Sequence, residues 1–334
     1  MLSKICATVI PFLLGAIMFV ENDKEWIFDP EYVFKLTKSI RAYMTDKHSI
    51  GEKITAVVKC RLNILSQIDK NILFCNANHI FVTYMSRVQD KNWKEIVDGV
   101  YSATPNKRSK KIPDQLFKIE FSKKGVQNFT LKTAKRKHYN IITDIIDQFN
   151  MGIDLSIARH RMESYESQKR GPYVISFFSN HQEKTTRAIK CNTSGTVKYT
   201  PLHQYNKDKT SGIQNNKKET KKTNFHFQLG LLPICDKYPA SKTLVINRIR
   251  NACTHQRRNL RFFNTKWKLI NVKQYSNTMK IHDEEPQFSS HTHVQGNVFF
   301  PISTTSVHKF EENVYLNLVR IKAARKELNT AEYE

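Results

Sequence analysis

Apolar and polar residues alternate in the middle of this chain with a period that predicts β-strands. Phe117, Ile119 and Phe121 are separated by charged residues, so they share one face of a strand. A polar turn at residues 122–125 follows, and residues 126–131 have the pattern of a returning strand. The stretch therefore predicts a β-hairpin.

An amphipathic helix is predicted directly after this hairpin. Apolar residues recur there at helical spacing, at Ile141, Ile142, Ile145, Ile146 and Phe149. Asp144, Asp147 and Gln148 fall on the other side of the same helix. We therefore expect a short helix near residues 141–149 that packs its apolar stripe against a sheet.

Similar alternation predicts further strands at short intervals along the chain. They cover residues 32–40, 53–64, 80–85, 173–178, 224–229, 243–249, 266–272, 297–302 and 312–321. Frequent short strands with few helices favour an antiparallel barrel or sandwich over an alternating α/β sheet. The predicted fold class is mainly β, an antiparallel β-barrel with a short embedded amphipathic helix and flexible polar insertions.

The first twenty residues have the layout of a secretory signal peptide. A single lysine precedes an apolar run at residues 5–20, which is too short for a comfortable membrane span. We therefore expect a secreted, extracellular protein without a membrane span, and an uncleaved N-terminal anchor is the alternative. Two N-glycosylation acceptors, at Asn128 and Asn192, fit the same compartment.

The remaining sequence divides by polarity. Residues 21–198 and 224–321 are expected to form the barrel. Between them, residues 199–223 are rich in lysine and asparagine and predict a flexible polar insertion. Residues 322–334 form a C-terminal tail, and its alanine- and lysine-rich part at 322–328 is compatible with the start of a helix.

Cysteine usage agrees with export into an oxidising compartment. The cysteines beyond the predicted leader are Cys60, Cys75, Cys191, Cys235 and Cys253, which predicts two disulfides and one odd thiol. Cys60 and Cys75 lie on or beside successive predicted strands, as do Cys235 and Cys253. Local bridges within these two pairs are plausible, although the sequence leaves the pairing open.

The chain is strongly basic, with 54 basic and 30 acidic residues and a formal net charge of +24. Basic residues gather at 107–111, 132–138, 217–222, 248–261 and 320–326. Such a field attracts polyanions at low salt, although each cluster alone is also typical of a solvated loop. The candidate polyanion-binding residues are Lys135, Arg136, Lys137, Arg257, Arg258 and Arg261.

Catalytic and metal-binding motifs are missing from the sequence. None of its ten glycines builds a phosphate-binding loop, and it lacks both a G-x-S-x-G elbow and an H-E-x-x-H helix. His291 and His293 form a pair, as do Cys253 and His255, but neither has a second pair at zinc spacing. We therefore expect no enzyme activity, no cofactor and no metal site.

Several of these segments resemble one known family. The hairpin and helix at 115–155, Trp26 with the E-Y-V-F element at 31–34, the strand at 54–65 and Met162-Glu163 are similar to the N-terminal barrel domain of the vitellogenins. Vitellogenins are egg-yolk storage precursors of the large lipid-transfer protein family. The resemblance is best over residues 26–173.

The resemblance implies a secreted protein of the lipid-transporter family. Vitellogenins continue from the barrel into a helical domain and further sheets that enclose lipid, whereas this chain ends near the end of the barrel. The expectation is a truncated vitellogenin-like protein used for receptor or polyanion binding rather than bulk lipid carriage, with bound lipid as a further ligand. The alternative is a basic extracellular module that binds heparin-like glycans, anionic membranes or nucleic acid.

One basic segment resembles a receptor-docking element of the family. The sequence EKTTRAIKC at 183–191 is similar to a stretch that in vitellogenins is implicated in docking to receptors of the lipoprotein-receptor class. The resemblance makes Lys184, Thr185, Arg187 and Lys190 candidate receptor-binding residues, and an exposed strand end is the alternative. The cysteine with which Cys191 pairs in the family is missing here, which implies a re-paired or free thiol.

Overall fold

The computed structural model describes residues 30–45, 48–62, 72–88, 94–95, 110–122, 125–132, 136–150, 152, 173–184, 190–201, 241–254, 259–262, 265–282, 288–299 and 307–333. Within these ranges the chain forms a 14-stranded sheet, the α-helix α1 (Arg136–Phe149) and the 3-10 helix η3 (Thr330–Tyr333). The mainly antiparallel β fold with one short helix, predicted from the sequence, is confirmed.

The strands pair in an antiparallel manner throughout the described sheet. They are β1 (Pro30–Thr45), β2 (His48–Leu62), β3 (Ile72–Val88), β4 (Lys94–Glu95), β5 (Lys110–Ile112), β6 (Gln115–Ser122), β7 (Gly125–Leu131), β8 (Tyr173–Lys184), β9 (Lys190–Pro201), β10 (Ser241–Thr254), β11 (Asn259–Phe262), β12 (Thr265–His282), β13 (Phe288–Phe299) and β14 (Val307–Ala323).

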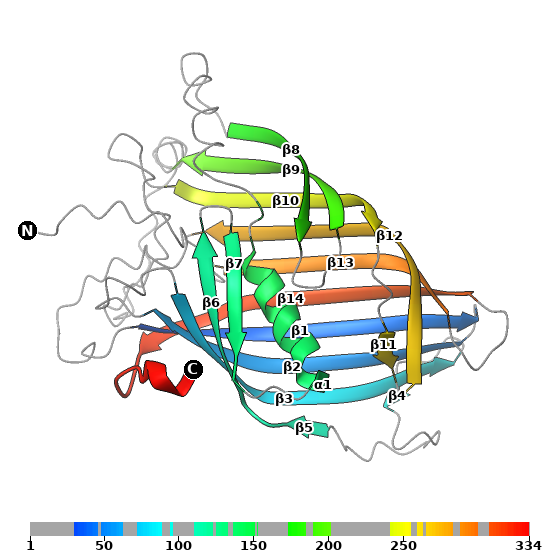
Figure 1. Cartoon of the computed structure of the whole chain (residues 1–334), viewed down its shortest axis with the longest axis horizontal. Coiled ribbons are helices and arrows are strands. Elements are labelled where there is room, and N and C mark those ends of the chain that lie inside the picture. Colours follow the sequence, from blue (N-terminus) through cyan, green and yellow to red (C-terminus); the bar gives the residue numbers. More distant parts are fainter. Residues whose placement is uncertain are drawn as a thin grey trace, which may run out of the picture.

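The sheet is large, and within the described residues it does not close into the barrel that the sequence predicted. Hydrogen-bonded neighbours run in the order β7-β6-β3-β2-β1-β14-β13-β12-β10-β9-β8, with β11 beside β12 and β4 and β5 beside β3 (Figure 1). The first and last strands along the described chain, β1 and β14, lie side by side in the middle of this order. The segment that contains α1 follows β7 at one end of the order and precedes β8 at the other.

Several predicted strands differ in their bounds from the observed ones, and the strand β9 (Lys190–Pro201) was not predicted. The strand expected at 80–85 is β3, which begins earlier, at Ile72. Polar residues such as Asn76 interrupt the apolar pattern there, but they remain in the strand because they pair with β2 on one side and β6 on the other. The strand expected at 297–302 is β13, which ends at Phe299 and extends back to Phe288. The strand expected at 224–229 and most of the insertion expected at 199–223 lie outside the described residues.

The helix α1 lies across one face of the sheet, which we call the inner face. Figure 1 shows it in front of the long strands, and it contacts β6 and β7 as well as β13 and β14. Its apolar stripe enters the main core, where the Phe149 ring lies 5.2 Å from that of Phe34 and 5.8 Å from that of Phe288, between centroids. Burial of each such side chain stabilises the fold by about 1.5–3 kcal/mol.

The end of the helix is attached to the preceding hairpin. The side-chain Oδ1 of Asn150 accepts hydrogen bonds from the backbone amides of Val126, at 3.3 Å, and Gly152, at 3.2 Å. Gly152 has a φ of 64°, a left-handed conformation that glycine adopts without steric cost. The chain therefore leaves the helix in a turn that β7 helps to hold.

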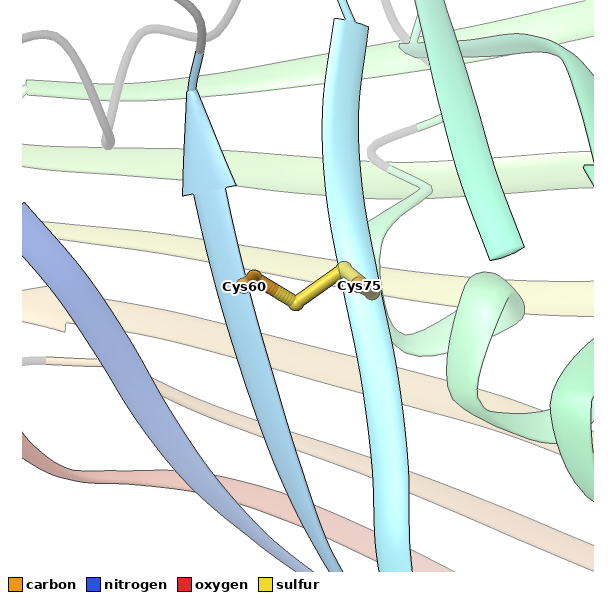
Figure 2. Close-up of a disulfide and its surroundings, with 2 residues drawn as sticks. All are labelled: Cys60 and Cys75. Atoms are coloured by element: carbon orange, nitrogen blue, oxygen red, sulfur yellow. A yellow bond between two sulfur atoms is a disulfide. The ribbon is translucent and has the colours of Figure 1, made fainter. Parts of the chain in front are cut away.

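A disulfide joins Cys60 on β2 to Cys75 on β3 (Figure 2). The two residues face each other in the strand register, and both are fully buried. One of the two local bridges considered from the sequence is thus present. Cys235 lies outside the described residues, and the side chains of Cys191 on β9 and Cys253 on β10 are not described.

The C-terminal tail packs on β2 and β3. The helix considered at 322–328 is absent, because β14 continues to Ala323 and bends follow it. The Arg61 side chain donates to the backbone carbonyl of Lys326 at 2.8 Å, and the Tyr333 ring lies edge-on to Phe74 at 5.2 Å. Among the described helices, none has the length and apolar character that crossing a membrane requires.

Candidate functional site

Exposed charge on the described residues is mostly positive. The exposed basic residues are Lys35, Lys53, Lys111, Lys132, Lys198, Lys273, Lys280, Lys309, Arg320, Arg325 and Lys326. Within the same ranges, the exposed acidic residues are Asp114, Glu327 and Glu332. The described surface therefore attracts anions, and the sheet face turned away from α1, the outer face, carries many of these cations.

Three exposed lysines lie in one row across the outer face. Strand register connects, in order, Lys198, Val245, Lys280, Ser289, Asn317 and Lys35. Neighbouring strands are about 4.8 Å apart, so successive lysines of the row are separated by roughly 10 and 14 Å. We call Lys35, Lys198 and Lys280 the lysine row.

A network of hydrogen-bonded side chains lies beside the lysine row on the same face. The Oδ1 atom of Asn313 lies 3.1 Å from His291 Nε2 and 2.9 Å from His293 Nδ1. Asn313 Nδ2 donates to Glu311 Oε1 at 2.9 Å, and the Tyr43 hydroxyl donates to Glu311 Oε2 at 3.0 Å. We call these five residues the outer polar network.

Glu311 is the anchor of this network. Partial burial acts to raise its pKa, but hydrogen bonds from Asn313 and Tyr43 and the charges of His293 and Arg41 outweigh burial and lower the pKa. Glu311 is therefore an anion at neutral pH. Burial, together with the hydrogen bond to Glu311, raises the pKa of Tyr43. The hydroxyl therefore stays protonated and acts as the hydrogen-bond donor to Glu311.

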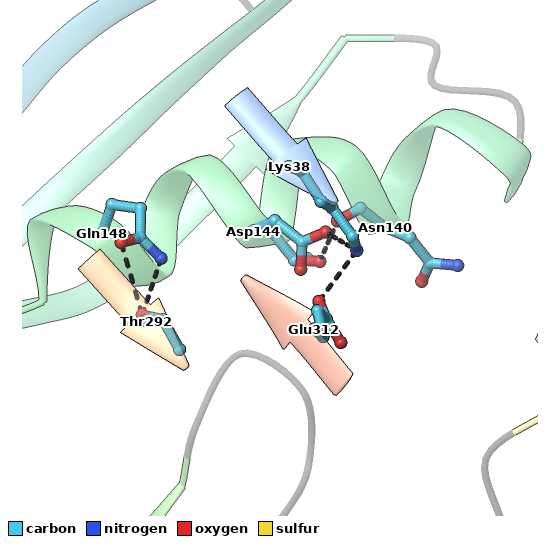
Figure 3. Close-up of polar contacts among 7 residues, drawn as sticks. Lys38, Asn140, Asp144, Gln148, Thr292 and Glu312 are labelled. Atoms are coloured by element: carbon cyan, nitrogen blue, oxygen red, sulfur yellow. Dashed lines mark hydrogen bonds and ion pairs between the residues drawn. The ribbon is translucent and has the colours of Figure 1, made fainter. Parts of the chain in front are cut away.

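Acidic residues are buried on the inner face around a single lysine. Lys38 of β1 forms ion pairs with Asp144 of α1 and, at 3.0 Å, with Glu312 of β14 (Figure 3). Asp144 is fully buried and Glu312 is 4% exposed. The polar side of α1 is thus buried as well as its apolar stripe, and charge pairing compensates the cost of burial.

Glu52 adds a further carboxyl group to this cluster. Burial, opposed by the charge of Lys38 and reinforced by the charge of Glu312, raises its pKa to about 7. Lys38 is already paired with two carboxylates, so a third negative charge at this place is unfavourable.

A second polar group continues across the inner face. Gln148 of α1 donates to Thr292 Oγ1 at 2.9 Å and accepts from Ser290 Oγ at 3.0 Å (Figure 3 shows the Thr292 contact). Asn277 donates to the same Thr292 oxygen at 2.9 Å, and Arg248 Nη2 donates to Asn277 Oδ1 at 2.7 Å. These contacts fix α1 to β13, and through Asn277 to β12 and β10.

Arg248 and Arg250 correct one expectation from the sequence. The basic cluster at 248–261 was expected on the surface, but these two side chains are 2% and 3% exposed. They alternate along β10 in phase with buried Leu244 and Ile246, which places them on the inner face. The Arg250 guanidinium lies 4.5 Å from the centroid of the Tyr275 ring.

The receptor candidates are only partly described. Lys184 and Lys190 face each other as the terminal register pair of β8 and β9, which brings two cations to the end of this hairpin. Thr185 and Arg187 lie outside the described residues. The polyanion candidates Lys135, Arg257 and Arg258 also lie outside them, and nothing describes the side chains of Arg136, Lys137 and Arg261.

Both predicted glycosylation acceptors are on the surface. Asn128 is exposed on β7, a strand at one end of the sheet order, and Asn192 is exposed on β9. In the ranges that the structure covers, His, Cys, Asp and Glu form no group of three or more that could hold a metal ion. His291 and His293, the pair considered for metal binding, instead contact Asn313.

Sequence reasoning missed both outer-face features. The members of the lysine row come from β1, β9 and β12 and form no cluster in the sequence. Only the strand register brings them into line. His291 and His293 were noticed as a pair, but their partners Asn313 and Glu311 belong to another strand.

No protein-family model and no curated protein matches the chain. Among solved structures, the chain is similar to one titled for lipid-protein interactions in lipovitellin, with 12% sequence identity and a TM-score of 0.47. The match covers 91% of this chain and 26% of that chain, so this chain spans about a quarter of the length of the solved one.

Proposed function

We propose that this chain is an exported, vitellogenin-like β protein whose outer face binds polyanions. The observation that carries the proposal is the lysine row, in which three exposed lysines are aligned across the outer face. The lysine row is exposed outside, whereas Asp144 and Glu312 are buried beside Lys38 inside. The buried carboxylates neutralise their own lysine and leave the outer cations for a ligand.

The spacing of the lysine row favours an extended ligand. Its lysines are separated by roughly 10–14 Å, which is at or beyond the distance at which salt screens exposed charges from one another. A small anion would therefore contact one lysine at a time. A chain with repeated negative charges contacts all three and gains from each, so a polyanion fits this row best.

Export is supported by independent features. The leader pattern of residues 1–20 predicts secretion, and a disulfide between Cys60 and Cys75 suits an oxidising compartment. Exposure of Asn128 and Asn192 suits glycan attachment. Extracellular polyanions are accordingly the ligands that the protein would meet.

Bulk lipid carriage is not part of this proposal. The inner face next to α1 is occupied by packed side chains, among them Phe34, Phe149 and Phe288, which supports a structural role for this interior. Lipid analysis of the purified, secreted protein gives an independent check. Abundant co-purified phospholipid would contradict this part of the proposal.

Titration with heparin at several salt concentrations tests polyanion binding. We expect affinity to fall steeply with salt, and the slope of log K against log salt to decrease by about one for each lysine of the row that is removed. The test variant is Lys35→Gln, Lys198→Gln and Lys280→Gln together. A triple variant of exposed lysines elsewhere, Lys111→Gln, Lys132→Gln and Lys326→Gln, has the same net charge, and equal losses in both would contradict a specific site.

A further inference from the structure

An exposed aromatic ring lies at the centre of the outer face. Tyr315 of β14 is 39% exposed, and its ring stacks on that of His291 with centroids 4.0 Å apart and planes 7° apart. His291 and Tyr315 are register partners. They lie two residues along their strands from Ser289 and Asn317, the residues that join Lys280 to Lys35 in the lysine row. Stacking on His291 thus fixes the Tyr315 ring, which presents an aromatic surface beside the lysine row.

The hydrogen-bonding directions around this ring are fixed. Asn313 Nδ2 donates to Glu311, so Oδ1 is the atom that faces both histidines. His291 Nε2 and His293 Nδ1 are therefore the donors in these contacts. No described residue bonds the second nitrogen of either ring, so His291 Nδ1 and His293 Nε2 remain for a ligand hydroxyl.

Positive charges surround this centre on several sides. Lys53 lies in the same cross-strand row as Asn313, since both are register partners of Ser39. Lys309 is the register partner of Tyr43 at the other side of the network. With Lys35 and Lys280, these exposed lysines place cations around a centre that offers an aromatic ring and polar hydrogen-bonding groups.

A ligand that fits this arrangement has a hydroxyl-rich ring and anionic groups at its periphery. The C–H face of a pyranose packs against an aromatic ring, its hydroxyls bond imidazole nitrogens, and its sulfates or carboxylates pair with lysines. An anionic membrane would satisfy the lysines but not the oriented hydrogen-bonding groups. We infer that Tyr315, His291 and His293 form a sugar-contacting subsite for a sulfated glycan, an assignment that rests on the proposed polyanion function.

Substitution of the aromatic ring tests this subsite without a change in charge. Tyr315→Ala should weaken binding of a heparin oligosaccharide by about tenfold, the loss expected from one stacking contact, while the salt slope stays unchanged. Tyr315→Trp should retain wild-type affinity. Tyr139→Ala, which removes a tyrosine of 40% exposure on α1, is the matched control and should bind as wild type. Equal affinity of Tyr315→Ala and wild type would overturn the inference.

The experiments distinguish a wrong assignment of the sugar subsite from a wrong proposal of polyanion binding. Wild-type protein that does not bind the oligosaccharide at any salt concentration would contradict the polyanion function itself. Binding that depends on the lysine row but not on Tyr315 would overturn the subsite alone. Vesicles of phosphatidylcholine and phosphatidylserine serve as a second probe, and dependence on Tyr315 for vesicles but not for the oligosaccharide would overturn the glycan assignment.

A measurement on the wild-type protein covers the case in which Tyr315→Ala does not fold. The imidazole NMR signals of His291 and His293 should shift when the oligosaccharide is added and should shift less with its fully desulfated form. Unchanged signals of both histidines at saturating oligosaccharide would overturn the subsite.

Discussion

Lys38 Nζ lies 3.0 Å from Glu312 Oε1 on the neighbouring strand and also pairs with Asp144 of the helix. One buried cation thus joins α1 to the two strands, β1 and β14, that meet in the middle of the sheet. Because both carboxylates pair with this one cation, removal of Lys38 leaves Asp144 and Glu312 without compensation.

Lys38→Met should destabilise the protein by about 3–5 kcal/mol, because two buried carboxylates would lose their cation. Urea unfolding followed by circular dichroism measures this loss. The variant that combines Lys38→Met with Asp144→Asn and Glu312→Gln should recover part of it, since no unpaired charge remains. A loss of less than about 1 kcal/mol in Lys38→Met, as for an exposed ion pair, would show that the cluster is not buried in solution.

Glu52 should make stability depend on pH. Its pKa is about 7 in the folded protein and 4.5 for the ordinary side chain, so between these values the folded state holds a proton that the unfolded state has released. Stability attributable to Glu52 therefore falls as pH rises from about 4.5, and the loss is complete above about 7. Glu52→Gln should be more stable than wild type by about 3 kcal/mol at high pH, with no such difference below about pH 4. Parallel stability curves for the two proteins would contradict this assignment.

Phe149→Ala should destabilise the fold by about 3–5 kcal/mol, because the ring fills the core between Phe34 and Phe288 and would leave a cavity. Tyr139→Ala on the same helix removes an exposed ring and should cost less than about 1 kcal/mol. Thermal or urea unfolding of the two variants gives the comparison. Similar effects of both would mean that α1 does not pack as observed.

Reduction of the Cys60–Cys75 disulfide should lower stability by about 3 kcal/mol, the loop-closure contribution for two cysteines that are 15 residues apart. Urea unfolding with and without reductant measures this change. In Cys60→Ala with Cys75→Ala, reductant should have a smaller effect. If alkylation of the native, oxidised protein labels Cys60 or Cys75, the bridge is absent.

Local patterns in the sequence sufficed to predict the hairpin β6–β7 and the core of α1. Phe117, Ile119 and Phe121 alternate, and the isoleucines recur at helical spacing, so a few neighbouring residues determine each element. Phe117, Ile119 and Phe121 of β6 are buried as expected. The apolar stripe of α1 is buried as well.

The parts that could not be predicted depend on contacts distant in the sequence. The inner face of β13 carries Ser290 and Thr292, which break the apolar alternation because they bond Gln148 of α1, more than a hundred residues earlier in the chain. Arg248 is buried for a similar reason, since its partner Asn277 lies on another strand. A basic residue in a strand is ordinarily assigned to the surface, and only the register shows otherwise.

The sequence and the structure lead to different candidate residues for polyanion binding. The net charge of +24 predicts polyanion binding, and the candidate residues from the sequence lie in contiguous basic clusters. The lysine row is built from single lysines on three strands, so no window of the sequence contains it.

Lysine footprinting by acetylation and mass spectrometry, with and without a bound heparin oligosaccharide, tests the central claim most directly. We expect the ligand to protect Lys35, Lys198 and Lys280, while Lys111, Lys132 and Lys326 react as in the free protein. Uniform protection of all six lysines, or protection confined to the latter three, would contradict a polyanion site on the outer face.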